Sequence, residues 1–183
     1  MSIRSRYVGI AVMILLLAGC GQPTPASPAP DVPVTPTDPS APTPPANDPA
    51  CGQPFDERPS GGLTMTGTFP KTANVDQQTV AGTVKITSSV TVEGVVGRSA
   101  DVYLVRDGKV VAVPGMRDAV GVVWKLTPGA TESLPATALL APCDPTGDRL
   151  APGTYAVHAT VVLTADDGTR LRAVGGPWPL ELR

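Results

Sequence analysis

The single histidine, His158, is the first residue to consider for catalysis, because imidazole is the usual general base near neutral pH. A hydrolytic site would place it beside an activated nucleophile, and the chain contains no Gly-x-Ser-x-Gly turn. His158 lies in a stretch of alternating residues, on the face opposite the apolar side chains. This pattern predicts an exposed strand histidine, and we expect the protein not to be an enzyme.

Carboxylates are the next groups that could do chemistry. The acidic loops 144–148 and 166–169 carry the oxygen atoms and glycine that calcium loops use, but neither has the spacing of an EF-hand. Aspartate is also common in turns, because its side chain caps nearby backbone N–H groups. Asp56 and Glu57 are neighbours on an extended chain, so their side chains should point apart. We therefore expect no metal site and no cofactor.

The N-terminus combines two cations, Arg4 and Arg6, with an apolar run over 7–17. That run is shorter than the ~20 residues needed to span a bilayer as a helix. It ends in Leu17-Ala18-Gly19-Cys20, which resembles the lipobox of bacterial lipoproteins. An uncleaved transmembrane anchor and an ordinary signal peptide are the alternatives.

The lipobox resemblance implies cleavage before Cys20, so that 1–19 is a signal peptide, and acylation of the Cys20 thiol. The protein would then be anchored by lipid to the cell membrane, facing its extracytoplasmic side. The other two cysteines, Cys51 and Cys143, can form a disulfide in an oxidising compartment. The alternative is two free or metal-binding thiols, although no His or Cys lies near either one at ligand spacing.

Composition and charge restrict the partners. The formal net charge is -2, and removing Arg4 and Arg6 with the signal peptide leaves 12 basic and 16 acidic residues. There is no basic stripe interleaved with aromatic residues, so we expect no binding of nucleic acid. A mildly acidic surface will not adhere to anionic lipids either, so membrane attachment must come from the anchor.

Segment 20–50 is a proline-rich stalk. Eleven of the thirty residues from 21 to 50 are Pro, and this stretch contains no Leu, Ile, Phe, Tyr or Trp. Such a segment buries too little apolar surface to offset the entropy of ordering, which predicts a disordered, extended spacer. A ligand for proline-binding modules or a glycosylation target is the alternative interpretation.

From residue 51 onward the apolar residues alternate with a period of two, which is typical of β-strands. Asp-Gly and Pro-Gly pairs separate the alternating stretches, as in hairpins and tight turns. The pattern predicts an all-β domain over 51–183, an antiparallel sandwich of seven or eight strands in which each strand turns one apolar face to the core. The expected strands are 63–69, 79–88, 101–106, 109–114, 120–127, 130–138, 154–164 and an interrupted 169–183.

The residues at 150–157, Leu-Ala-Pro-Gly-Thr-Tyr-Ala-Val, resemble the tyrosine corner of immunoglobulin-like sandwiches. In that fold the tyrosine, here Tyr155, opens a strand and its hydroxyl bonds to the backbone just upstream. Val157 occupies the position where antibody domains have a cysteine. The Pro-Gly turn at 128–129, together with 150–155, is similar to bacterial proteinase-inhibitor-type Ig-like domains.

These features lead to one functional expectation and one alternative. We expect a membrane-anchored lipoprotein that acts as a non-enzymatic binding or structural module of the cell envelope, with an envelope protein or a polysaccharide as partner. The alternative is a protease inhibitor that presents a loop of the sandwich, either 113–119 or 139–150.

Overall fold

Alternating apolar residues form ten strands in the computed structural model, which describes residues 48–117, 120–144, 146–147 and 149–183. The signal peptide, Cys20 and most of the stalk lie outside these described residues. Within them no segment is helical, and so none could cross a bilayer as a helix. All ten strands belong to one compact unit.

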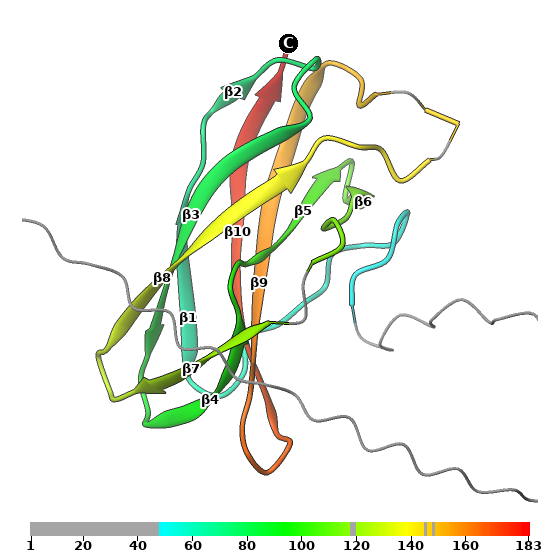
Figure 1. Ribbon diagram of the computed structural model, residues 1–183. Helices are drawn as coiled ribbons and strands as arrows, with labels where there is room; N and C mark the ends of the chain where they lie inside the picture. Colours follow the sequence, from blue (N-terminus) through cyan, green and yellow to red (C-terminus); the bar gives the residue numbers. More distant parts are fainter. Residues whose placement is uncertain (1–47, 118–119, 145, 148) are drawn as a thin grey trace, which may run out of the picture. The chain divides into compact units, whose positions relative to one another are not determined.

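Two sheets make the sandwich (Figure 1). The strands are β1 (Leu63–Thr68), β2 (Thr72–Ala73), β3 (Thr79–Ser88), β4 (Val92–Gly97), β5 (Asp101–Arg106), β6 (Lys109–Ala112), β7 (Gly121–Leu126), β8 (Thr131–Leu139), β9 (Gly153–Thr164) and β10 (Arg170–Leu182). The smaller sheet has the order β1-β3-β8 and the larger one the order β2-β10-β9-β4-β7, with β5 paired to β9 and β6 to β5. Every pairing is antiparallel except that of β2 with β10.

The prediction of an all-β, Ig-like antiparallel sandwich is confirmed, but the described residues form ten strands, not seven or eight. The two additional strands are β2 and β4. β2 has only two residues, too few to show a period. β4 contains two glycines, which weaken a strand pattern. One of them, Gly94, is needed because a Cβ atom there would lie 2.5 Å from the carbonyl oxygen of Thr164.

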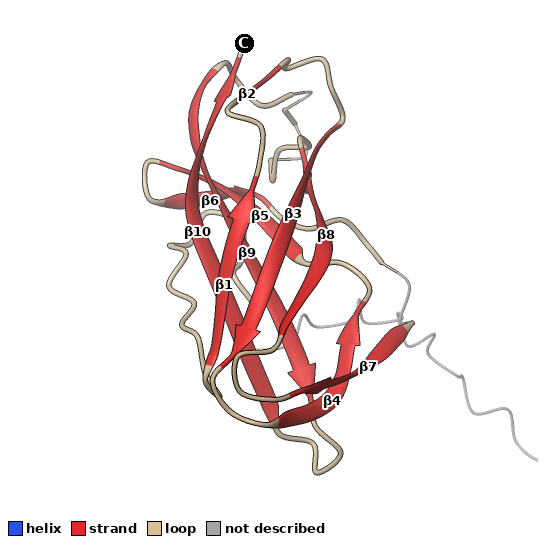
Figure 2. Cartoon of the chain, turned by 90° about the vertical axis from the view of Figure 1, so that its left-hand side faces the viewer, coloured by secondary structure: helices blue, strands red, loops and turns tan. Residues whose placement is uncertain are grey.

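The strands of both sheets, drawn in Figure 2, contribute the buried apolar residues of the main core. Trp124 is buried in it, as its alternation with Val123 and Lys125 indicates. The largest fully buried side chains are Val84, Ile86, Val96, Val102, Leu104, Val110, Leu126, Val157, Leu163, Leu180 and Leu182. Burying one such side chain stabilises the fold by roughly 1.5–3 kcal/mol.

The turns follow the sequence signals. Asp107 and Gly108 both have positive φ, 52° and 75°, and join β5 to β6 as a tight hairpin. The sequence Gly-Gly-Pro at 175–177 interrupts the last expected strand. In the structure it is a register shift between Gly175 and Trp178, and β10 pairs with β9 on both sides of it.

Candidate functional site

The segment before β1 crosses the outer face of the larger sheet. We call residues 48–60 the strap. Its first half joins β6: the Gly52 N–H donates to the Val110 carbonyl and the Val110 N–H to the Gln53 carbonyl, each at 2.8 Å. In Figure 1 the strap is the cyan segment that passes β6 and β5 on its way to β1. It therefore adds a short pairing to a strand that would otherwise be an edge.

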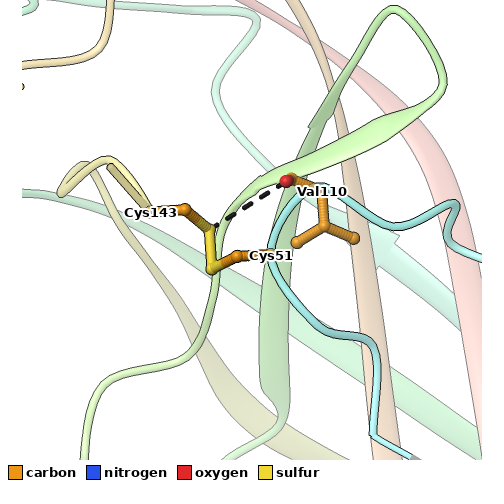
Figure 3. Close-up of a disulfide and its surroundings, with 3 residues drawn as sticks. All are labelled: Cys51, Val110 and Cys143. Carbon is orange, nitrogen blue, oxygen red and sulfur yellow. Dashed lines mark hydrogen bonds between the residues drawn. A yellow bond between two sulfur atoms is a disulfide. The ribbon is translucent and has the colours of Figure 1, made fainter. Parts of the chain in front are cut away.

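A disulfide fixes the strap at Cys51. Its partner is Cys143, with the two Cα atoms 5.6 Å apart, as the sequence analysis predicts (Figure 3). The Cys143 N–H donates to the Val111 carbonyl at 2.8 Å, so both bridged segments also hydrogen-bond β6. The Cys143 sulfur lies 3.9 Å from the Val110 carbonyl oxygen, which is a packing contact because an oxidised sulfur has no proton to donate.

Aromatic packing holds the middle of the strap. The Phe55 ring lies 5.5 Å from that of Tyr103 on β5 and 4.3 Å from the imidazole of His158 on β9. Tyr103 is only 4% exposed, and with Val105 and Val110 it forms a second apolar cluster outside the main core. The prediction of an exposed His158 is therefore wrong, because the strap half-buries it.

Burial under the strap changes the acidity of both rings. The pKa of Tyr103 is raised well above its usual value, first by loss of solvation and then by the carboxylates of Asp101 and Asp48. Loss of solvation lowers the pKa of His158. The imidazole is therefore neutral at pH 7 and packs as an aromatic ring.

An ion pair holds the end of the strap against β10. The Arg172 guanidinium bonds Glu57, and its other Nη atom lies 3.6 Å from an Asp48 oxygen. The Arg172 and Glu57 side chains are only 14% and 10% exposed. The backbone joins as well, because the Ser60 N–H donates to the Arg172 carbonyl at 2.8 Å and the Arg172 N–H to the Ser60 hydroxyl at 2.9 Å. Asp56 is exposed while Glu57 is not, so these neighbours do point apart, as predicted.

The strap and the start of β10 border an open cleft of about 690 Å³. Its lining carries three arginines and three carboxylates. The residues are Asp48, Pro49, Ala50, Gln53, Pro54, Asp56, Glu57, Arg58, Ser60, Arg170 and Arg172. We take this cleft as the candidate binding site. From the sequence, Arg170 and Arg172 share a face of an expected strand and could form an anion-binding or partner-binding edge, with a solvated strand face as the alternative. The strap's part in the cleft could not be predicted, because the strap has no periodicity and its partners lie more than 45 residues away.

Tyr155 forms the predicted corner. Its hydroxyl donates to the Ala151 carbonyl, four residues upstream, at 2.5 Å. The Arg106 guanidinium donates to the same hydroxyl at 3.2 Å and lies over the ring, 5.4 Å from its centre. These contacts fix the entry of β9, the strand that carries His158.

Aspartates in both acidic loops cap their own turns. The Asp144 carboxylate accepts the Thr146 N–H at 2.9 Å and its hydroxyl at 2.6 Å, and Asp167 accepts the Thr169 N–H at 2.8 Å. These bonds lower the pKa of both carboxyls. Among the described residues no three His, Cys, Asp or Glu side chains converge as a metal site would require.

The loop after β6 presents one side chain fully to solvent, that of Met116. Arg117 follows it and is held tightly. Its guanidinium donates to the carbonyls of Ser99 and Ala100 at 2.6 and 2.5 Å, and it lies 2.7 Å from an Asp101 oxygen. The exposed Met116 side chain therefore lies next to Arg117, which these contacts hold in place.

No family model matches the chain, and no curated protein matches it. Among solved structures it is similar to the sporulation control protein Spo0M of Bacillus subtilis (17% identity, TM-score 0.39) and to a β-glucosidase of Listeria innocua (13%, 0.35). Another is a PapD-like domain of human CEP192 (15%, 0.28). These alignments cover 67%, 66% and 72% of this chain, and 50%, 16% and 90% of the others. The similarities are too distant to indicate an activity.

Proposed function

We propose that the protein is a lipoprotein anchored through Cys20 to the extracytoplasmic side of the cell membrane, and that its sandwich is a non-enzymatic binding or structural module of the envelope. The observation that carries this proposal is the lipobox-like Leu17-Ala18-Gly19-Cys20 after a short apolar run. The Cys51–Cys143 bridge supports it, because structural disulfides persist in oxidising compartments.

Mass spectrometry of the N-terminal peptide tests the anchor. We expect a chain that begins at Cys20 and carries acyl chains, because two or more chains are needed for stable attachment. Cys20→Ser should give unprocessed precursor or protein without acyl chains. An intact residue 1, or an unmodified Cys20 in the native protein, would contradict the proposal.

Protease inhibition is the second candidate function, and Met116 is the observation that favours it. A fully exposed, unbranched apolar side chain beside an anchored Arg117 suits insertion into the specificity pocket of a protease. The other loop considered, 139–150, is tied to the body by Cys143.

A panel of serine proteases, assayed with the full chain, tests this second function. Met116→Asp should abolish inhibition, because a carboxylate does not enter an apolar pocket without a large desolvation cost. Arg98→Gln, a change at an exposed position between β4 and β5, serves as the control. Inhibition that survives Met116→Asp would rule out this loop.

A further inference from the structure

We propose that the cleft between the strap and β10 binds a short acidic peptide with a free amino terminus. The inference names a ligand for the binding module proposed above and rests on that function, but it does not depend on the lipid anchor. The inference depends on the charged side chains of the cleft: some already form ion pairs within the protein, and others do not.

Arg172 does not face the ligand as a free charge, because Glu57 and Asp48 pair with it and it is almost buried. The other two arginines of the cleft, Arg58 and Arg170, are exposed. Within the described part of the chain, neither one has an ion-pair or hydrogen-bond partner for its guanidinium. A guanidinium binds a carboxylate with two parallel hydrogen bonds, so these two arginines are suited to two carboxylates.

The Glu57–Arg172–Asp48 group keeps one negative charge in excess, because a single guanidinium faces two carboxylates. The third charge of the cleft without an ion-pair partner is Asp56. It lines the same cleft, is exposed, and forms no ion pair with any described residue. A carboxylate so placed suits an ammonium group of the ligand. A purely anionic ligand would be repelled by Asp56. A purely cationic ligand would be repelled by Arg58 and Arg170. A peptide end with one amine and two carboxylates complements all three.

The dimensions agree with a small ligand. About 690 Å³ is within the 300–1,000 Å³ typical of ligand sites. The walls are polar apart from Pro49, Ala50 and Pro54, which favours a hydrogen-bonding ligand of a few residues over an apolar one.

The disulfide and the ion pair hold this site in shape before any ligand arrives. Cys51 lies between Ala50 and Gln53, which both line the cleft, so its bond to Cys143 fixes one wall. The pairing of Glu57 with Arg172 ties the strap to β10, and both residues line the cleft. A preformed site loses less conformational entropy on binding than a flexible one.

Isothermal titration of the full chain with the tripeptide Ala-Glu-Ala tests the inference. We expect saturable binding that weakens about tenfold in Arg58→Gln and in Arg170→Gln, since each removes one charge-assisted contact. Asp56→Asn should weaken Ala-Glu-Ala but not its N-acetylated form. Arg98→Gln is the matched control and should bind like the parent chain.

Three results with the tripeptide would overturn the inference. They are the absence of saturable binding, equal affinity for the acetylated and free tripeptides, and affinities unchanged by both arginine substitutions. Tighter binding of an oligogalacturonate than of the tripeptide would also overturn it, in favour of an acidic saccharide. Because the titration needs no membrane, failure here leaves the lipid-anchor result unaffected, and failure of the anchor leaves the titration valid.

Discussion

Removing the disulfide should loosen the strap and weaken the whole domain without unfolding it. The double variant Cys51→Ser with Cys143→Ser makes this change without a reductant. In the structure the bond lies outside the main core: Cys51 is exposed, and Cys143 packs at the margin of the smaller apolar cluster around Tyr103. The strands of the main core are joined by hydrogen bonds that the bond does not touch.

The size of the effect follows from the loop that the bond closes. Its ends are 92 residues apart, and the chain-entropy treatment puts the loss from opening such a loop at about 4–5 kcal/mol, as an upper figure. A domain of roughly 135 residues is typically stable by about 7–15 kcal/mol. The variant should therefore remain folded, with a lower free energy of unfolding.

Urea unfolding of the parent chain and the variant measures the global change. Amide hydrogen exchange then locates the local one: exchange should accelerate most at Gly52, whose N–H bonds Val110, while the amides of β3 and β9 stay protected. Equal free energies of unfolding would mean that the bond does not form in the parent chain. A variant with no cooperative transition would mean that the bond is essential to the core, and our description of the strap as a separate layer would be wrong.

Two further substitutions test single contacts. Tyr155→Phe removes the hydroxyl that bonds Ala151 and should lower the free energy of unfolding by about 1–2 kcal/mol in urea titrations, with an unchanged circular dichroism spectrum; no change would mean that the corner contributes nothing. His158 has a folded-state pKa below 6.5, so as pH falls from 6.5 towards that pKa only the unfolded chain gains the proton, and stability should fall over this window and then level off. His158→Gln should remove this part of the pH dependence, and identical pH profiles for parent and variant would disprove the assignment.

The strands with one apolar face were the predictable part of the fold. Residues 79–88 are a strand with the predicted bounds, because apolar residues recur there with a period of two. Residues 101–106 also have the predicted bounds, but their four central residues are apolar and buried on both faces, and the Asp-Gly turn after them marks their end. β4 escaped prediction for a physical reason: Gly94 sits where the pattern needs an apolar residue, and the close approach of Leu163 leaves no room for one. Periodicity in a sequence is read from its side chains. A strand with a glycine on its buried face therefore gives a weak signal.

The candidate site was less accessible to sequence reasoning. Phe55 is the one large apolar residue between 48 and 58, which indicates a contact but not its partners. Those partners, Tyr103 and His158, lie on β5 and β9 and come together only when the sheet has formed. Glu57 and Arg172 are 115 residues apart and carry no shared motif. Contacts of this kind depend on the three-dimensional arrangement of the strands, which local periodicity does not encode.

The order of contacts along the strap bears on how a tethered domain would carry load. For a chain anchored at Cys20, as proposed above, tension reaches Cys51 before it reaches Phe55 or β1. At Cys51 it meets a covalent bond to Cys143 and, one residue later, the hydrogen bonds to β6. The aromatic contacts of Phe55 and the cleft residues that follow Cys51 are therefore shielded from a pull along the stalk, whereas Asp48, Pro49 and Ala50 precede the bond and are not. Without the bond, the same pull would act first on a few exposed hydrogen bonds, which are the weakest attachments of the strap.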